Sequence, residues 1–262
     1  FGASIEEIGI KAGNGFSSSL ERILDDNDFP ENFIVDGDLI RRYNIVNTTK
    51  KIGYLDIFEA IQDASNGDSL ILDGSFNLDE RINITKPITI SGIDNQVEII
   101  ASIPYTTANS GKHMLSVGGT ENVTIENIIF NSNDNAHGIQ AFESQNVTFK
   151  NLELINSRGP GMIVNTSTVT ASGIKSDNNP WGGINVDIGS QAADGENSVL
   201  NLIGSNDLLD LPQIWSDGTN VDDNNTVTVN AVGYTRYGLT DPNSPHQDDR
   251  FPNGFNWYKE NE

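Results

Sequence analysis

The sequence contains no cysteine, which excludes disulfide bonds and thiolate metal sites. It also has few basic residues, 15 Lys and Arg against 37 Asp and Glu, which gives a formal net charge of −22. A field of this sign repels phosphate, so we expect no nucleic-acid partner and no docking on an anionic membrane. The acidic surplus suits Ca²⁺ binding, a salty medium, or simple solubility. No apolar run approaches the ~18 residues that span a bilayer, so we expect no membrane insertion.

The chain begins at Phe1 without a methionine, so we expect that an upstream segment, such as a signal peptide, was removed and that the protein is secreted, extracellular or attached to a cell surface. Residues 1–53 differ from the rest and are interpreted as a lead-in or a domain fragment. Within them, hydroxyl residues followed by helix formers predict a short helix over Ser17–Leu24. Residues 54–233 form a repetitive region, and residues 234–262 form an aromatic-rich tail.

Three similar segments begin at Asn122, Asn146 and Thr168, at steps of 24 and 22 residues. Periods of 20–50 residues indicate a solenoid. Each segment opens with apolar residues that alternate with polar ones, as a strand with one buried face requires. Each then turns at an equivalent position, namely Asn127, Asn151 and Gly173. A second strand follows, and then a third strand that begins at a glycine: Gly138, Gly161 and Gly183.

Aligning the segments predicts which residues lie side by side. The inward rows of the third strand are expected to be Ile139, Met162 and Ile184, and then Ala141, Val164 and Val186. On the outer face, Glu126 is expected beside Lys150, and Glu153 beside Lys175. Opposite charges on adjacent strands are favourable, which supports this register. Ser132, Asn156 and Asn178 align at one turn, where stacked Asn side chains can satisfy backbone groups.

Residues 54–92 carry a further pattern. Apolar residues at helical spacing predict a helix over residues 57–64, which ends at Asn66-Gly67-Asp68. Short strands follow at residues 69–72 and 81–85 and in the segment KPITISG. This stretch resembles the N-terminal cap and first turns of the right-handed parallel β-helix superfamily, which includes pectate lyases, alginate lyases, epimerases and many surface proteins.

The resemblance implies an all-β fold, a right-handed parallel β-helix whose N-terminal end is covered by the helix. The repeats extend it to about residue 230, with later strands at 199–202 and 227–229. A solenoid needs its last open turn covered, and the aromatic-rich residues 234–262 are expected to form that C-terminal cap.

The candidate binding residues lie on and just before the glycine-led strands. The strands carry Gln140, Phe142, Asn165, Asn185 and Asp187, and the preceding loops carry Asp134, His137, Arg158 and Trp181. Aligned repeats are expected to bring these loops to one edge. An indole stacks on sugar rings and a guanidinium grips uronate carboxylates, so we expect an extended polysaccharide as ligand.

Each candidate also has a purely structural interpretation. Trp181 would pack over its own loop, and His137 would be a plain turn residue. Arg158 would pair with a surface acid, and Asp187 would be one more solvated acid.

The resemblance also implies an enzymatic alternative, a polysaccharide lyase, C5-epimerase or glycoside hydrolase, with His137, Arg158 and Asp187 as catalytic candidates. In pectate-lyase-like enzymes, Ca²⁺ held by several Asp residues neutralises the uronate. Asp134, Asp177 and Asp187 are the candidates here, without a dense cluster. The segment Ser244–Asp249 departs from the Asp-Pro-His-Asp/Glu motif of alginate epimerases. Asp222-Asp223 comes nearest to the paired carboxylates of a glycosidase.

The scarcity of basic residues opposes strongly acidic polymers unless Ca²⁺ bridges. We therefore expect a non-catalytic surface module, such as part of an adhesin or a surface-layer protein, that contacts polysaccharide or another surface polymer. The tracts NPWGGINVDIGS and LPQIWSDGTN resemble segments of bacterial surface β-helix proteins. The other alternative is a structural subunit that assembles with itself into a filament or lattice.

Overall fold

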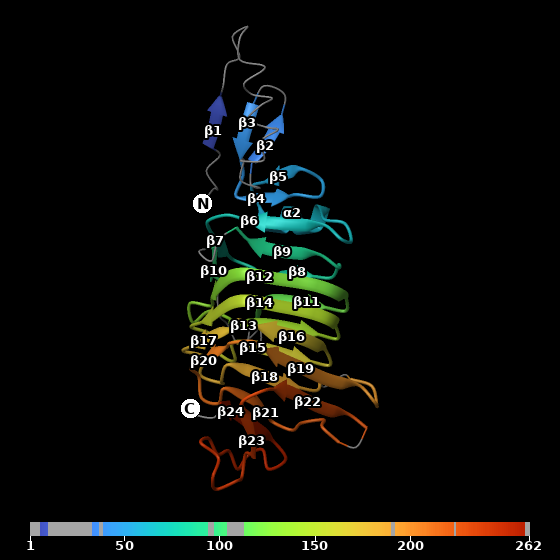
Figure 1. Cartoon of the computed structure of the whole chain (residues 1–262), viewed down its shortest axis with the longest axis vertical. Helices are drawn as coiled ribbons and strands as arrows, with labels where there is room; N and C mark the ends of the chain where they lie inside the picture. Colours follow the sequence, from blue (N-terminus) through green and yellow to red (C-terminus); the bar gives the residue numbers. More distant parts are fainter. Residues whose placement is uncertain are drawn as a thin grey trace.

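A computed structural model describes residues 6–9, 33–36, 39–93, 97–103, 113–189, 192–222 and 224–259. Over these residues the protein is mostly β, with largely parallel sheets and a single short helix, α2 (Ile57–Asp63). The strands are stacked along the long axis of the molecule, with the C-terminal strands at the opposite end from the N-terminal ones (Figure 1). The helix predicted over Ser17–Leu24 lies outside the described residues. No described helix has the length and apolar character needed to cross a membrane.

The largest sheet has thirteen strands. Its main path runs in the order β22 (Thr226–Ala231), β19 (Asn197–Ile203), β16 (Thr168–Ser172), β14 (Gln145–Ile155), β12 (Glu121–Asn131), β9 (Thr89–Gly92), β6 (Ser69–Leu72), β4 (Ile45–Asn47) and β5 (Ile52–Tyr54). Four further strands join beside this path: β7 (Ser75–Leu78), β10 (Val97–Ala101), β17 (Lys175–Asp177) and β20 (Asp207–Leu208). Pairing is parallel from β6 to β22.

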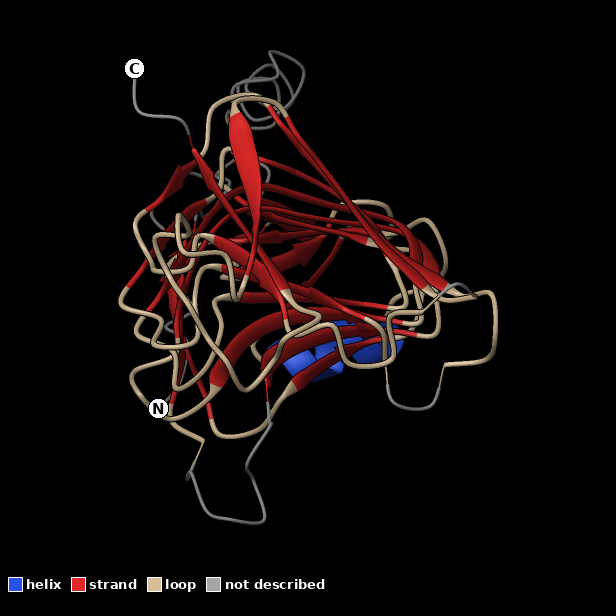
Figure 2. Cartoon of the chain, turned by 90° about the horizontal axis from the view of Figure 1, so that it is seen from below, coloured by secondary structure: helices blue, strands red, loops and turns tan. Residues whose placement is uncertain are grey.

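The second sheet has eight strands, in the order β23 (Tyr234–Gly238), β24 (Phe255–Lys259), β21 (Ile214–Ser216), β18 (Ile184–Asp187), β15 (Met162–Asn165), β13 (His137–Phe142), β11 (His113–Gly118) and β8 (Ile82–Ile84). Successive segments of the chain alternate between the two large sheets. The strands therefore surround a common interior, which the end-on view shows (Figure 2). A separate antiparallel sheet contains β1 (Glu6–Gly9), β3 (Leu39–Arg42) and β2 (Phe33–Asp36).

The interior is apolar and follows the predicted rows. Ile139 pairs with Met162, which pairs with Ile184, and the row from Ala141 through Val164 to Val186 is formed in the same way. All six side chains are fully buried. Burial of stacked aliphatic rows of this kind is the main favourable contribution to folding.

The outer face confirms the predicted register. Glu126 and Lys150 are paired across β12 and β14, and Lys150 Nζ lies 3.0 Å from Glu126 Oε2. Glu153 faces Lys175 in the same register. The turn at Asn127 differs from the prediction, because β12 continues through it as one strand. Asn127 absorbs the bend with a left-handed φ of 59°, a conformation that Asn tolerates better than most residues.

An asparagine ladder crosses the corner of the sheet. Asn178 Nδ2 donates to Asn156 Oδ1 at 2.8 Å, and Asn156 Nδ2 donates to Asn131 Oδ1 at 3.1 Å. The predicted third member was Ser132. Its hydroxyl instead points to Met114 Sδ at 3.1 Å, and Asn131 takes its place in the ladder.

The N-terminal and C-terminal ends of the stacked strands differ from each other. At the N-terminal end, Asp56 precedes α2 as its N-cap, and its carboxylate accepts hydrogen bonds from the backbone N–H groups of Phe58 and Glu59. The sheet itself begins before the predicted boundary at Tyr54, because β4 and β5 already pair with it. At the C-terminal end, β24 pairs antiparallel with β21, so residues 234–259 extend the second sheet.

Candidate functional site

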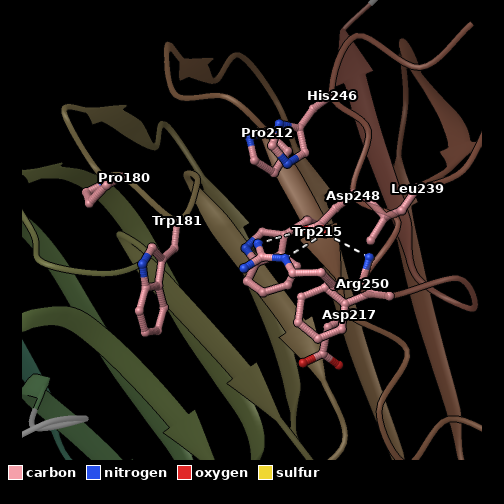
Figure 3. A pocket seen from close by; sticks show the side chains of 10 residues that line it. Pro180, Trp181, Pro212, Trp215, Asp217, Leu239, His246, Asp248 and Arg250 are labelled. Carbon is pink, nitrogen blue, oxygen red and sulfur yellow. Dashed lines mark hydrogen bonds and ion pairs between the residues drawn. The ribbon is translucent and has the colours of Figure 1, made fainter.

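A pocket of about 370 Å³ lies on the C-terminal part of the eight-stranded sheet. Three segments form its walls: the turn at Pro180 and Trp181 before β18, the region from Pro212 to Asp217 that includes β21, and the loop between β23 and β24. The last of these contributes Leu239, His246, Asp248, Arg250 and Phe251. In the close view, His246 and Asp217 lie at opposite edges of the pocket (Figure 3).

Aromatic side chains form much of the pocket wall. Trp181 is 54% exposed, and its ring packs edge-on against buried His137 with 5.1 Å between ring centroids. The ring centroids of Trp215 and Phe251 lie 6.5 Å apart. Trp215 Nε1 is buried without a hydrogen-bond partner. An anchored, half-exposed indole beside a second aromatic pair offers flat apolar surface to a ligand.

The pocket contains one ion pair. Arg250 Nε and Nη2 contact the two oxygens of Asp248 at 2.8 and 2.6 Å. These hydrogen bonds lower the pKa of Asp248 to about 2. The Arg250 side chain is 80% exposed, but both carboxylate oxygens of Asp248 are engaged with its guanidinium, so the two charges offset each other at the pocket wall.

Asp187 and Asp217 form a pair of neighbouring carboxylates. Asn185 is paired with Trp215 across the parallel strands β18 and β21, and Asp187, which ends β18, lies beside Asp217, which follows β21. Asp187 is 8% exposed and accepts hydrogen bonds from Ser216 Oγ at 3.0 Å and from the Asp217 N–H at 3.3 Å. Asn185 Nδ2 donates to it at 3.1 Å.

Burial and then the charge of Asp217 raise the pKa of Asp187 to about 7. Asp217 lines the pocket and is partly exposed, and its Oδ1 accepts a hydrogen bond from the Thr219 N–H at 2.7 Å. Below about pH 7 Asp187 therefore keeps its proton, and it lies behind Asp217, which faces the pocket. Such a pair can exchange a proton with a ligand or bind a cation.

The structure separates two of the residues that the enzymatic alternative groups as catalytic candidates. His137 begins β13, whereas Asp187 ends β18, in the row that continues from Phe142 through Asn165. His137 and Phe142 are five residue steps apart along an extended strand, a distance of roughly 16 Å. His137 and Asp187 therefore lie near opposite ends of the strands of this sheet, too far apart to act on the same bond.

His137 is buried and is not a surface turn residue. Its ring lies beneath Gly159 and 5.3 Å from the ring of His113 on the neighbouring strand. No ring nitrogen of the two histidines has a partner. Burial, and then the charge of Arg158, lower the pKa of His137, so the imidazole is held neutral. This environment suits packing beneath Trp181 better than proton transfer.

The other predicted residues take varied positions. Asp134 and Arg158 are exposed in turns, Asp177 is exposed at the end of β17, and Gln140 Nε2 donates to Ser116 Oγ at 2.7 Å. The described residues include no group of three or more His, Cys, Asp or Glu side chains placed to hold a metal ion, so Asp134, Asp177 and Asp187 form no such group. Asp222 accepts hydrogen bonds from its own turn at Asn224 and Asn225, and Asp223 lies outside the described residues.

Sequence reasoning missed Trp215, Asp217 and Arg250. A signal for Asp217 was present, because Ile184-Asn185-Val186-Asp187 and Ile214-Trp215-Ser216-Asp217 share the spacing Ile-x-x-Asp. The two copies are 30 residues apart, outside the steps of 24 and 22 residues that define the repeat, so the repeat does not align them. Arg250 reaches the pocket from the loop between β23 and β24, for which the repeat provides no register.

Comparison with known proteins finds no matching family model, no matching curated protein and no matching solved structure. The chemistry of the pocket is therefore what indicates a function. Its aromatic walls, its neutralised ion pair and its carboxylate pair are the features that any ligand has to fit.

Proposed function

We propose that the protein is an extracellular, cell-surface module that binds a polysaccharide in the pocket between Trp181, Trp215 and Asp217. We further propose that its two large sheets are coils of a right-handed parallel β-helix of the pectate-lyase-like superfamily. The alternation of parallel strands between the sheets at steps of 22 to 24 residues supports this fold. Binding, without catalysis, is the proposed activity.

The observation that carries the proposal is the exposure of Trp181. A large apolar side chain that is 54% exposed gains little for folding, and here it stands at the wall of a pocket. Buried His137 holds the ring from one side and leaves its remaining surface open. Indole faces stack on the C–H faces of sugar rings, and a rigid anchored ring loses little conformational freedom on binding.

The shape of the pocket suits an extended chain. Its wall from Pro212 to Asp217 is six residues long and includes the strand β21, and six extended residues span roughly 16 Å. This length exceeds a single sugar ring. The open edge at Trp181 and the edge at Asp217 would let a polymer continue in both directions.

The test is Trp181→Ala, measured by affinity electrophoresis and calorimetry against a panel of polysaccharides. We expect roughly tenfold weaker binding, because aromatic anchors carry much of the energy of such interfaces. Leu209→Ala is the matched control: Leu209 is 62% exposed and does not line the pocket, so binding should be unchanged. Unchanged binding in Trp181→Ala, or an equal loss in both variants, would refute the proposal.

The carboxylate pair supports a second candidate, a glycoside hydrolase. Asp217 would protonate the glycosidic oxygen as the C–O bond breaks, water would add to the anomeric carbon, and the proton released by that water would return to the Asp187–Asp217 pair. A reducing-end assay on the same polysaccharides tests this, with absorbance at 235 nm to detect elimination. Product that disappears in Asp217→Asn would favour the enzyme, and binding without product would favour the module.

A further inference from the structure

The charges around the pocket are unbalanced. Asp248 and Arg250 neutralise each other through two hydrogen bonds, which leaves Asp217 as the unmatched charge at the wall. Among the described residues, neither Asp217 nor Asp187 forms an ion pair with a basic side chain. The chain as a whole carries a net charge of −22, which adds to the local negative potential. An anionic sugar such as a uronate is therefore disfavoured at Asp217.

A metal ion is a poor match for the unpaired negative charge of Asp217. Ca²⁺ takes six to eight oxygen ligands, and the described residues contain no group of three or more candidate ligand side chains. One partly exposed carboxylate, backed by a second that is buried, matches a single positive charge. A primary ammonium group carries that charge and donates hydrogen bonds to carboxylate oxygens.

A second observation points to a ligand that also carries an acceptor. Trp215 lines the pocket and is paired in register with Asn185, two residues before Asp187. Its indole N–H is buried and has no acceptor. A buried donor without a partner costs free energy, and a bound hydroxyl or ring oxygen would recover it once the side chains at the pocket wall shift enough to expose the N–H. The ligand should therefore bring an oxygen acceptor together with its cation, which a simple amine does not.

We infer that the pocket binds an amino sugar with a free protonated amine, which pairs with Asp217 while the sugar ring faces Trp215 and Phe251 and an oxygen accepts from Trp215 Nε1. This inference rests on the proposed function, because it names the class of glycan for the same pocket. The polymer would be a glycan whose hexosamine units lack the N-acetyl group. N-acetylation would remove the charge and add bulk at the carboxylate.

The experiment compares three oligosaccharides of equal length by calorimetry at about pH 6, where an ordinary Asp carboxylate is ionised. One is built of glucosamine, one of N-acetylglucosamine and one of glucose. We expect the glucosamine oligomer to bind roughly tenfold tighter than the other two, as one hydrogen bond between charged groups allows. Its binding should also release protons from the pair, which appears as a dependence of the heat on buffer ionisation.

Asp217→Asn tests the residue assignment. Asparagine keeps an acceptor for the Thr219 N–H and removes only the charge, so the advantage of glucosamine should fall roughly tenfold while glucose binding stays the same. Asp194→Asn is the matched control, since it makes the same change of net charge at an exposed position outside the pocket.

The possible outcomes distinguish failure of the amino-sugar inference from failure of the glycan-binding function. Equal affinity for the three oligomers would overturn the amino-sugar inference and leave the glycan-binding function standing. A preference for glucosamine that survives in Asp217→Asn, or that is lost equally in Asp194→Asn, would mean that general attraction to an acidic protein is responsible, and would also overturn it. No binding of any oligomer or of the wider polysaccharide panel would overturn both proposals.

Discussion

Asp187, the last residue of β18, lies beside Asp217, which directly follows the neighbouring strand β21, and the backbone N–H of Asp217 donates to Asp187 Oδ2 at 3.3 Å. The contrast with Glu126 and Lys150 is informative, because those residues are paired across neighbouring strands with opposite charges. Like charges directly opposite each other destabilise a sheet. A carboxylate pair that persists at such a position is a candidate for function, since it contributes little to folding at neutral pH.

The stability of the protein should fall as the pH rises through this pair. Asp187 has a pKa of about 7 in the folded protein against about 3.9 when unfolded, so the folded state holds the proton more tightly. The free energy of unfolding therefore declines between about pH 4 and pH 7, by a few kcal/mol at most. Asp187→Asn, which mimics the neutral acid, should remove that part of the decline. Urea unfolding at pH 5 and pH 8 measures it.

General repulsion in an acidic protein changes stability in the same direction, so the comparison needs a control. Asp194→Asn lowers the net negative charge equally at an exposed site and should keep the wild-type pH dependence. If Asp187→Asn and the wild type lose equal stability from pH 5 to pH 8, Asp187 is not the titrating group.

The paired histidines should weaken the fold at acidic pH. Burial, then the charges of His137 and Arg81, lower the pKa of His113 to about 3 from about 6.5. A lowered histidine pKa means that the unfolded chain takes up the proton first, so stability is lost as the pH falls below about 6.5. At pH 5 the loss for His113 is roughly 2 kcal/mol.

The variant His113→Leu removes this titration and two ring nitrogens that lack partners. It should match or exceed the wild-type melting temperature at pH 8 and gain several degrees on it at pH 5. If the difference in melting temperature between His113→Leu and the wild type is the same at both pH values, His113 does not titrate on unfolding.

The asparagine ladder offers a test that separates its hydrogen bonds from its backbone geometry. Asn156 bonds to Asn131 and Asn178 and has a φ of 57°. Asn156→Gly loses the bonds and keeps the conformation, which should cost about 1 kcal/mol. Asn156→Ala should cost about 1 kcal/mol more, because alanine is strained at positive φ. Equal losses in the two variants, measured by urea unfolding, would show that the backbone conformation contributes nothing.

The strand register could be predicted from the sequence because the buried apolar residues recur with the period of the repeat. A row such as Ile139, Met162 and Ile184 is visible wherever one face of each strand must be apolar. The turns were also visible, since left-handed positions such as Asn127 and Gly173 select Asn or Gly. The continuity of β12 through its turn was not visible, because hydrogen bonding on both sides of Asn127 depends on the neighbouring strands.

The pocket was harder to predict because its walls come from three separate segments. Trp181 was predicted from the sequence as an indole that stacks on sugar rings, and in the structure its side chain is 54% exposed. Sequence spacing does not say whether a strand residue lies at the start or the end of its strand. His137 and Asp187 were therefore grouped as catalytic candidates, although His137 begins its strand and Asp187 ends its own. The wall that contains Asp248 and Arg250 depends on where a long loop folds back, which no periodicity determines.

Gly138 tests the close pairing of β13 and β15, on which the pocket-bearing sheet depends. A Cβ atom on Gly138 would overlap the carbonyl oxygen of Gly161 on the adjacent strand, and backbone cannot move aside as a flexible side chain can. Gly138→Ala should therefore lower the free energy of unfolding by roughly 3 kcal/mol or more. Gly118→Ala is the matched control on β11, because its nearest neighbour would be Ser116 Oγ at 3.8 Å. That variant should unfold within about 1 kcal/mol of the wild type. Equal stability of the two variants in urea would mean that the strands do not approach each other as the parallel register requires.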